Sequence, residues 1–498
     1  MPNKDATEDE LPEQMRVRRG KYDRLMADLA RAPFPVGVPR THSLAEIRTA
    51  YPDLEAGTET GQLVGVTGRV IFVRNTGRLC FATLREDGVE LQLMLSQDRV
   101  GAEALVAWKS DVDLGDHVFA HGEVISSKRG ELSVLADSWR LTAKALRPLP
   151  VAHKPLSEET RVRQRYVDLI VRPEAREMVY TRAAVTRSVR ETMHARGYVE
   201  VETPVLQVVH GGAAARPFET HLNAFDLDMS LRIATELFLK RCIVGGISRV
   251  YEMGRVFRNE GVDSTHSPEF MELEAYEAYG DYDTMAELTR QIVHDAAAAT
   301  GVTAPVAADG TEIELAGPWR KAPIHDLVSE AVGEPVTPDT DAAQLRRHAE
   351  RLSVALHDDF EAGDIVLELY EKLVEHTLVQ PTFVTDYPVA VRPLARPHRD
   401  DPRLTESWDL VVGGVETAVA YSELVDPVEQ RRRLVEQSVA AAQGDPEAMQ
   451  LDEDFLCALE YGMPPSGGLG VGIDRLVMLL TGKGIRETIL FPIVKPLQ

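Results

Sequence analysis

One stretch, residues 255–279, constrains the fold of this chain more than any other. β-Branched and aromatic residues dominate 250–257, and apolar and polar residues alternate over 270–276, so both segments are predicted to be strands. The polar residues between them form the loop of a hairpin. Because successive strand side chains point to opposite faces, one face of the second strand is apolar and the other carries Phe270, Glu272, Glu274 and Tyr276.

The acidic face has two interpretations. A half-buried strand ordinarily turns its charges to water, and this alternative stays open for the strand taken alone. The hairpin partner favours a site, because Arg258 ends the first strand and the loop carries Glu260 and His266. A guanidinium can hold a carboxylate or phosphate at two points, and a row of carboxylates can hold a cation. The hairpin therefore predicts a site for a ligand that carries both signs of charge.

Composition sets outer limits on the class of protein. The 498 residues are 44% hydrophobic and 27% charged, which is ordinary for a globular protein of two or three domains. No apolar run reaches the length of a membrane span, and the first residues have no signal core, so we expect a cytoplasmic protein. The net charge of −24 argues against indiscriminate nucleic-acid binding. A basic segment at 16–31 is either a solvated helix face or a phosphate-contacting arm.

The first third of the chain predicts a small barrel. Five short strands are expected at 64–74, 79–84, 90–95, 117–125 and 131–139. A five-stranded barrel of this size that binds oligonucleotides is the OB-fold. Phe81, Gln92 and Glu131 are candidates for stacking on and reading single-stranded bases, although a core position is the alternative for Phe81.

Proline-rich segments divide the chain. We expect an N-terminal basic helix and linker over 1–60, the barrel over 61–146, a linker over 147–172, and a second domain over 173–498 with a mostly helical insertion at about 283–375. The second domain starts with a helix over 173–196, whose apolar residues fall at helical spacing. The strand that follows ends at Pro204, which places it at an edge of a sheet.

The last part of the chain carries two further patterns. Over 416–424, period two places Glu416 on the same face as Ala418 and opposite Val419. Asp409, Glu416 and Glu423 are spaced for a magnesium ion held through oxygen, although unrelated surface charges are the alternative. Residues 467–480 predict a glycine-rich turn that leads into an apolar helix and delivers Arg475 beside a phosphate.

With these residues in view, the chain resembles the class II aminoacyl-tRNA synthetases, and within them the bacterial lysyl-tRNA synthetases, over essentially its whole length. The class signatures are a helix and strand ending at Pro204, the hairpin residues 257–260, and the segment 470–475. The segments similar to the lysine-specific branch are 211–218, 236–241 and 421–424.

The resemblance implies an α+β protein: a five-stranded OB-fold β-barrel that reads the anticodon, followed by a catalytic antiparallel sheet flanked by helices. It implies a homodimer built on the first signature. It also implies the reaction of a lysine–tRNA ligase, in which ATP and L-lysine give lysyl-adenylate and pyrophosphate, and the lysyl group then passes to the terminal ribose of lysine tRNA. Mg²⁺ is the implied metal, and no membrane is involved.

The resemblance also implies a role for each matching residue. At the ATP end, Arg258 holds the α-phosphate and the substrate carboxylate. The other ATP contacts are Glu260, His266, Phe270 under the adenine, and Arg475 at the γ-phosphate. Asp409, which stands where the family often has glutamate, and Glu416 are the implied Mg²⁺ ligands.

At the lysine end, the implied ligands divide between the two amino groups. The main-chain carbonyl of Gly212 and the side chain of Glu236 take the α-amino group. Glu274, Tyr276 and Glu423 form the pocket for the ε-ammonium, and Tyr421 belongs to the same binding site.

The chain departs from the family pattern at five positions. Val419 replaces an asparagine that touches the substrate carboxylate, and the other departures are Ala420 for glycine, Thr235 for proline, Ser230 for an aromatic residue and Arg392 for a small hydroxyl residue. One lost neutral hydrogen bond is worth on the order of 1 kcal/mol, so Val419 alone weakens lysine binding several-fold.

Two alternatives to the main hypothesis remain open from sequence. One is a synthetase paralogue that activates a lysine analogue or charges an acceptor other than tRNA. The other is a non-catalytic tRNA-binding or regulatory protein, which the intact Arg258, Glu260, His266 and Arg475 disfavour.

Overall fold

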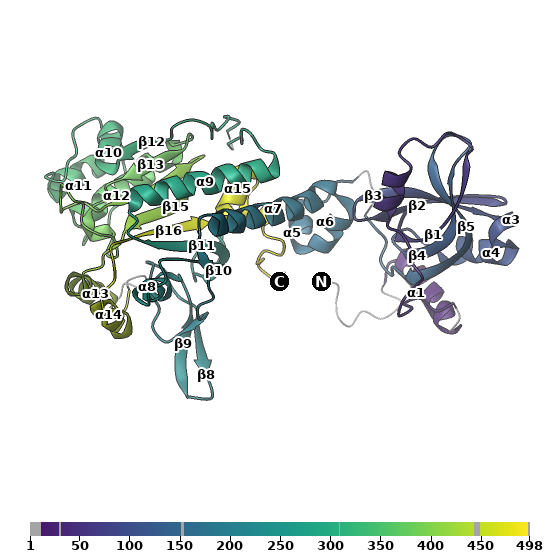
Figure 1. Ribbon diagram of the computed structural model, residues 1–498, viewed down its shortest axis with the longest axis horizontal. Helices are drawn as coiled ribbons and strands as arrows, with labels where there is room; N and C mark the ends of the chain where they lie inside the picture. Colours follow the sequence, from purple (N-terminus) through teal and green to yellow (C-terminus); the bar gives the residue numbers. More distant parts are fainter. Residues whose placement is uncertain (1–10, 29–30, 151–153, 308, 443–448, 497–498) are drawn as a thin grey trace. The chain divides into compact units, whose positions relative to one another are not determined.

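The computed structural model describes residues 11–28, 31–150, 154–307, 309–442 and 449–496, which form two compact units (Figure 1). The first unit comprises Met1–Arg176 and Val494–Gln498, and the second comprises Glu177–Ile493. The division falls within helix α7 (Pro173–Ala195), next to the start expected for the second domain. In the described part of the chain, no helix combines the length and apolar character needed to cross a bilayer.

The first unit is built on a closed five-stranded barrel in the order β1-β2-β3-β5-β4, as expected for an OB-fold. Its strands are β1 (Glu59–Thr76), β2 (Leu79–Glu86), β3 (Val89–Ser96), β4 (His117–Ser126) and β5 (Leu132–Ala143). Its helices are α1 (Glu13–Met26), α2 (Leu44–Ala50), α3 (Gln97–Val100), α4 (Ala102–Asp111), α5 (Glu158–Arg163) and α6 (Arg165–Val171). Inward-facing Val66, Leu93 and Val118 are fully buried, because alternate side chains of each strand fill the barrel.

The basic segment at 16–31 attaches α1 to the barrel. Arg18 is buried and donates to backbone carbonyls of the barrel unit. Lys21 Nζ lies 2.7 Å from Asp113 Oδ1, and Arg31 Nη2 lies 2.5 Å from Asp111 Oδ2. These side chains therefore have a structural use that neither sequence interpretation included. Residues 1–10 and 29–30 of the expected N-terminal segment lie outside the described residues.

The second unit is organised by an eight-stranded sheet in the order β12-β13-β14-β15-β16-β11-β10-β6. Its strands are β6 (Val199–Glu200), β10 (Arg249–Phe257), β11 (Glu269–Ala278), β12 (Arg320–Pro323), β13 (Thr382–Thr385), β14 (Ser407–Val412), β15 (Val415–Ser422) and β16 (Ser466–Gly472). The inner pairs are antiparallel, and only the β12–β13 and β10–β6 pairs at the two edges are parallel. The hairpin prediction is confirmed, with Val256 opposite Phe270.

Helices cover both faces of this sheet (Figure 1). One face packs against α7, α9 (Tyr282–Thr300) and α15 (Ile473–Thr481), and Leu273 and Ala275 of β11 join this core. Val189 and Met193 of the predicted helical stripe are fully buried there. On the other face, Tyr276 belongs to a core with α8 (Glu236–Val244), α13 (Pro427–Ala442) and α14 (Glu453–Glu460). The site lies on this second face.

The remaining elements lie around the sheet. Within the expected insertion, α9 packs on the sheet and β12 joins it, so only the helices after β12 form a separate core. These are α10 (Ile324–Val332), α11 (Ala342–Arg351) and α12 (Ala362–Leu373), followed by the 3-10 turns η2 (Glu375–Thr377) and η3 (Val389–Val391). A small sheet contains β7 (Leu206–Gln207), β8 (Glu219–Leu222) and β9 (Leu227–Leu231), and α16 (Ile485–Thr488) follows α15.

Two local predictions were wrong. The glycine-rich segment is the central strand β16 and not a turn. Glycine is needed in this strand because neighbouring side chains fill the space of a larger residue: a Cβ on Gly468 would lie 1.8 Å from Glu423 Oε1. Glu416 does not share a face with Ala418, because the pairing of β14 with β15 skips Thr417. Such a bulge reverses the alternation, so Glu416 lies on the face of Val419.

Candidate active site

Arg258 stands at the end of β10, where the loop begins. Its Nε donates to the backbone carbonyl of Ile233 at 3.3 Å, and its Nη2 lies 3.8 Å from Glu272 Oε2. The guanidinium carbon is 5.1 Å from the ring centre of Phe270. Two neighbouring elements therefore position this arginine, which is about a quarter exposed with 28% of its side-chain surface accessible and is open to an anionic ligand.

A second cationic group lies at the start of α15. Arg475 Nη1 donates to the Glu416 carbonyl at 2.7 Å and lies 3.2 Å from Glu416 Oε1. Its Nη2 donates to His266 Nε2 at 3.3 Å, while His266 Nδ1 faces Asp263 at 2.9 Å. The structure thus brings the predicted γ-phosphate residue and the loop histidine together at one end of the site.

Glu260 lies in the same loop and is exposed. Its Oε1 accepts a hydrogen bond from the Arg216 amide at 3.4 Å, and the Arg216 carbonyl accepts one from the Asn259 amide at 2.7 Å. These bonds connect the hairpin loop to the glycine-led loop that contains Gly212.

Asp474 is a positioning residue that sequence reasoning missed. It is buried, pairs with Arg182, and its Oδ2 accepts from the Met271 amide at 2.7 Å. It therefore attaches the start of α15 to β11 and fixes the position of the adjacent Arg475. An acidic residue directly before the signature arginine was the available signal.

The predicted lysine-binding carboxylates form one buried cluster. Glu274 is 5% exposed, accepts from the Thr235 amide at 2.8 Å through Oε1, and accepts from Tyr276 Oη at 3.1 Å through Oε2. Gly212 has a φ of +90°, and a Cβ there would lie 3.0 Å from Glu236 Cβ. The two residues predicted for the α-amino group are thus adjacent, and the glycine is required both by its backbone conformation and by this contact.

Glu423 occupies the other end of the cluster. It is 1% exposed, and beyond an ion pair with Lys240 neither carboxylate oxygen accepts a hydrogen bond from a described residue. This carboxylate fits there because Gly468 has no Cβ. Lys240 was not predicted, although its spacing of four residues from Glu236 on one helix face was a usable signal.

Burial dominates the electrostatics of the cluster. It raises the pKa of Glu274 well above the usual range, and Glu272 and Glu236 raise it further. It also raises the pKa of Glu423 to about 8, against the opposite effect of the Lys240 ammonium. Buried acids with raised pKa values are stabilised in their charged form by a cation, so this pocket is suited to an ammonium ligand.

Asp409 is not arranged as a magnesium ligand, because its carboxylate is already paired with a cation of the protein. It forms an ion pair with Arg392, whose guanidinium carbon also lies 4.3 Å from the Tyr387 ring centre. The described residues contain no group of three or more His, Cys, Asp or Glu side chains able to hold a metal. Glu416 is 39% exposed beside Arg475 and remains suited to a cation that carries phosphate oxygens.

The five departures from the family pattern have different surroundings. Thr235 supplies the amide hydrogen bond to Glu274, which a proline cannot donate. Arg392 donates to Tyr421 Oη at 3.4 Å in addition to its pair with Asp409. Val419 is half-buried opposite Asp409, and Ala420 and Ser230 are buried. Nothing in the structure explains Ser230.

The barrel brings all three predicted base contacts into one groove. Phe81, Gln92 and Glu131 line a groove of about 720 Å³. Phe81 faces outward from β2 rather than into the core, and the Arg74 guanidinium lies 4.6 Å from its ring centre. Sequence reasoning missed Phe72, Arg74, Arg48, Lys128 and Arg129, which line the same groove. The outward period-two positions of β1 predict Phe72 and Arg74.

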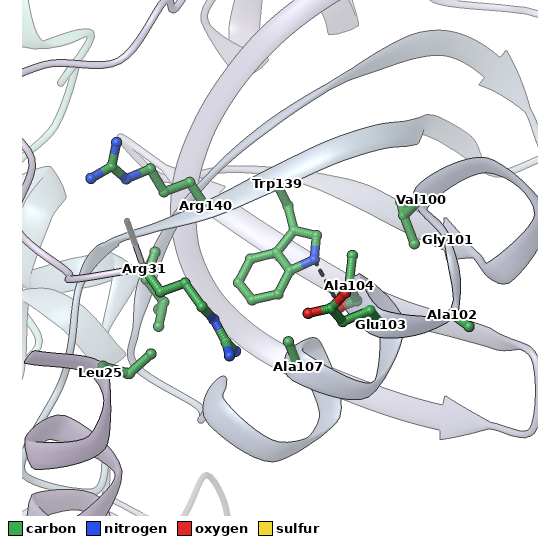
Figure 2. A pocket seen from close by; sticks show the side chains of 11 residues that line it. Leu25, Arg31, Val100, Gly101, Ala102, Glu103, Ala104, Ala107, Trp139 and Arg140 are labelled. Carbon is green, nitrogen blue, oxygen red and sulfur yellow. Dashed lines mark hydrogen bonds between the residues drawn. The ribbon is translucent and has the colours of Figure 1, made fainter. Parts of the chain in front are cut away.

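A second pocket of about 460 Å³ lies beside Trp139 (Figure 2). The indole Nε1 donates to the Ala104 carbonyl of α4 at 3.2 Å, and Arg31 lies beside the indole. None of the predicted base contacts lines this pocket, so it is separate from the groove on the barrel.

Comparison with known proteins agrees with this geometry. Residues 157–495 match the family described as tRNA synthetases class II (D, K and N), and residues 64–142 match the OB-fold nucleic acid binding domain. The chain therefore belongs to the class II tRNA synthetases.

Relatives that match the whole chain identify its branch within this class. The chain is 60% identical over 491 residues to the lysine–tRNA ligase of Mycolicibacterium gilvum and 58% identical over 498 residues to that of Mycobacterium tuberculosis, with 98% of each chain covered. Within the class, it belongs to the lysine–tRNA ligase family. It is also 52% identical over 494 residues to the lysylphosphatidylglycerol biosynthesis bifunctional protein LysX of Mycobacterium ulcerans, of which it covers 44%.

Proposed function

We propose that this chain is a lysine–tRNA ligase that activates L-lysine with ATP and transfers it to lysine tRNA. The observation that carries the proposal is the buried cluster of Glu236, Glu274 and Glu423 on the same sheet face as Arg258. An amino acid with a second ammonium group satisfies the carboxylates, while its own carboxylate meets the arginine.

The first step joins the lysine carboxylate to the α-phosphorus of ATP and releases pyrophosphate. Adenylyl transfer needs positioning and charge neutralisation more than a protein nucleophile. Arg258 orients the carboxylate and the α-phosphate, Phe270 stacks under the adenine, Arg475 neutralises the γ-phosphate, and His266 contacts the ATP. Glu260 completes the ATP contacts.

In the second step, a terminal ribose hydroxyl of the tRNA attacks the lysyl carbonyl and AMP leaves. Gly212, Glu236 and the ε-ammonium pocket of Glu274, Tyr276, Tyr421 and Glu423 hold the lysyl group in place during both steps. Phe81, Gln92 and Glu131 read the anticodon from the barrel groove, whose aromatic and basic lining suits single-stranded bases.

Mg²⁺ would supply further neutralisation of the ATP phosphates when bound. Glu416 fits this role, whereas a metal at Asp409 requires Arg392 to leave its ion pair. We further propose a cytoplasmic homodimer. Exposed apolar side chains in the first signature and directly after it support the dimer; they include Tyr180, Val199, Val205 and Leu206.

The paralogue alternative is less well supported. The match of residues 64–142 to the OB-fold domain argues against an acceptor other than tRNA. The ammonium cluster keeps every carboxylate expected for lysine, so the five departures alter its surroundings rather than its charge.

An exchange screen tests the proposal. Pyrophosphate exchange into ATP is measured with lysine, ornithine, arginine and β-lysine, followed by charging of purified lysine tRNA. Lysine should be the best substrate, and Arg258→Ala should abolish exchange. Arg255→Ala is the matched control, because Arg255 lies on the same strand in an exposed pair with Glu269. No exchange with lysine at saturating ATP and magnesium would refute the proposal.

A further inference from the structure

Lys240 is a fully buried lysine that the proposed reaction does not use. Its exposure is 0%, and its Nζ lies 2.6 Å from Glu236 Oε1 and 2.5 Å from Glu423 Oε2. These are the carboxylates proposed for the α-amino group and for the ε-ammonium. A cation of the protein itself therefore stands between the two halves of the substrate pocket.

The fold makes this arrangement rigid. Lys240 follows Glu236 by four residues on α8, so both side chains lie on one helix face. Glu423 comes from the chain after β15, where its amide donates to the Ser466 carbonyl at 2.8 Å. A structural role, in which the lysine only offsets the burial of two carboxylates, is the simple alternative.

Charge counting favours a role in specificity. Glu272 faces Arg258 at 3.8 Å and is balanced by it. When ionised, the other three carboxylates, Glu236, Glu274 and Glu423, supply three negative charges, and Lys240 returns one positive charge. The remaining charge of minus two equals and opposes the two ammonium groups of lysine. Without Lys240, the buried pocket would hold one more negative charge than its ligand balances.

We propose, on the basis of the proposed lysine specificity, that Lys240 is a positioning residue: it separates Glu236 and Glu423 into two ammonium subsites and matches the pocket's charge to a diamino acid. Lys240 touches no reacting atom and acts through the two carboxylates.

Removing this cation changes how the pocket binds protons. Burial raises the pKa of Glu423 to about 8 even with Lys240 beside it, and the Lys240 ammonium opposes that rise. Without Lys240 this buried carboxylate loses its counter-charge and binds its proton more tightly. Lysine then has to displace a proton that is held more tightly than in the wild type. The titratable and charged groups facing the cluster are Glu236, Lys240, Glu272, Glu274, Tyr276, Tyr421 and Glu423, with Asp409 and Arg392 beyond Tyr421.

The test is calorimetric titration of the full-length protein with L-lysine, in buffers of different ionisation enthalpy, at pH 7 and pH 8.5. For Lys240→Met we expect a Kd at least about tenfold higher at pH 7, since one pKa unit is a factor of ten. We also expect more protons released per lysine than in the wild type at pH 8.5, where the wild-type Glu423 is largely ionised, and a Kd that falls as the pH rises. The KM of Lys240→Met for ATP in pyrophosphate exchange should stay unchanged.

Lys144→Met is the matched control. Lys144 is also fully buried and pairs with two carboxylates, Asp113 and Asp116, but it lies in the barrel. This variant should lose stability without changing the proton count or the affinity for lysine.

Three outcomes separate the hypotheses. Wild-type protein that does not bind lysine refutes the proposed function. Wild-type protein that binds lysine, with Lys240→Met binding it at the same affinity and proton count, overturns the role of Lys240 alone. Where Lys240→Met does not fold, Lys240→Arg decides, because it keeps the charge: the wild-type proton count supports the proposal, and a changed count overturns it.

Discussion

Gly468→Ala is the substitution for which the structure makes the sharpest prediction. The glycine lies on β16, and a Cβ there would lie 1.8 Å from Glu423 Oε1 and 2.6 Å from Tyr276 Cε1. Both neighbours belong to the proposed ε-ammonium pocket. Neither can move freely, because Glu423 is paired with Lys240 and Tyr276 donates to Glu274.

The size of the effect follows from this overlap. The Glu423 carboxylate has to shift by about 1 Å, and a displacement of that size at a binding group can cost about 100-fold in rate. We therefore expect kcat/KM for lysine to fall by about 100-fold, mainly through a higher KM. Overpacking should also lower the free energy of unfolding by about 1–3 kcal/mol. The KM for ATP should change less than about twofold, since binding energy is lost only at the lysine pocket.

The assay is pyrophosphate exchange with lysine varied at saturating ATP, and with ATP varied at saturating lysine. Gly470→Ala is the matched control on the same strand and face, because its Cβ would meet only Glu272 Oε1, at 3.4 Å. Its KM for lysine should stay near the wild-type value. A Gly468→Ala protein that folds and keeps the wild-type KM for lysine would show that Glu423 and Tyr276 do not bind the ε-ammonium.

Three further predictions concern other parts of the molecule. Arg392→Ser removes the cation paired with Asp409, so Mn²⁺ binding followed by electron paramagnetic resonance should tighten; unchanged binding would exclude Asp409 as a metal ligand. Phe81→Ala should raise the KM for tRNA about 5- to 150-fold, as expected for about 1–3 kcal/mol of base stacking, and leave pyrophosphate exchange unchanged; equal loss of both activities would contradict a role limited to tRNA. Burial raises the pKa of Glu423 from 4.5 to about 8, so its contribution to stability is complete below pH 4.5 and is lost as the pH rises through 8. Thermal unfolding should show this decline, and Glu423→Gln should flatten it.

Much of the fold was predictable because its local signals are periodic. The hairpin, the barrel strands and the stripe on α7 each repeat at the period of their element. The wrong predictions arose where a distant neighbour decides the conformation. Only a glycine fits the strand at position 468, because Glu423 and Tyr276 occupy the space that a side chain would need. Neither of these residues is near Gly468 in sequence.

The positions of the candidate site residues on their strands were predictable, but their pairings were not. The hairpin residues Arg258 and Glu274 lie where alternation and resemblance placed them. The ion pair of Arg392 with Asp409 could not be foreseen, because it joins the loop after η3 to the strand β14. The bulge at Thr417, which moves Glu416 to the site face, has no marker in the sequence.

The position of β16 has a consequence for how the protein folds during synthesis. This strand follows every other strand of its sheet in the chain, yet it sits between β15 and β11 in the middle of the sheet. Until it emerges from the ribosome, both neighbouring strands present unpaired edges, which are sites of misassociation between chains. A chain terminated before Ser466 should therefore be recovered in aggregates or bound to chaperones, even though the other seven strands of its sheet have been made.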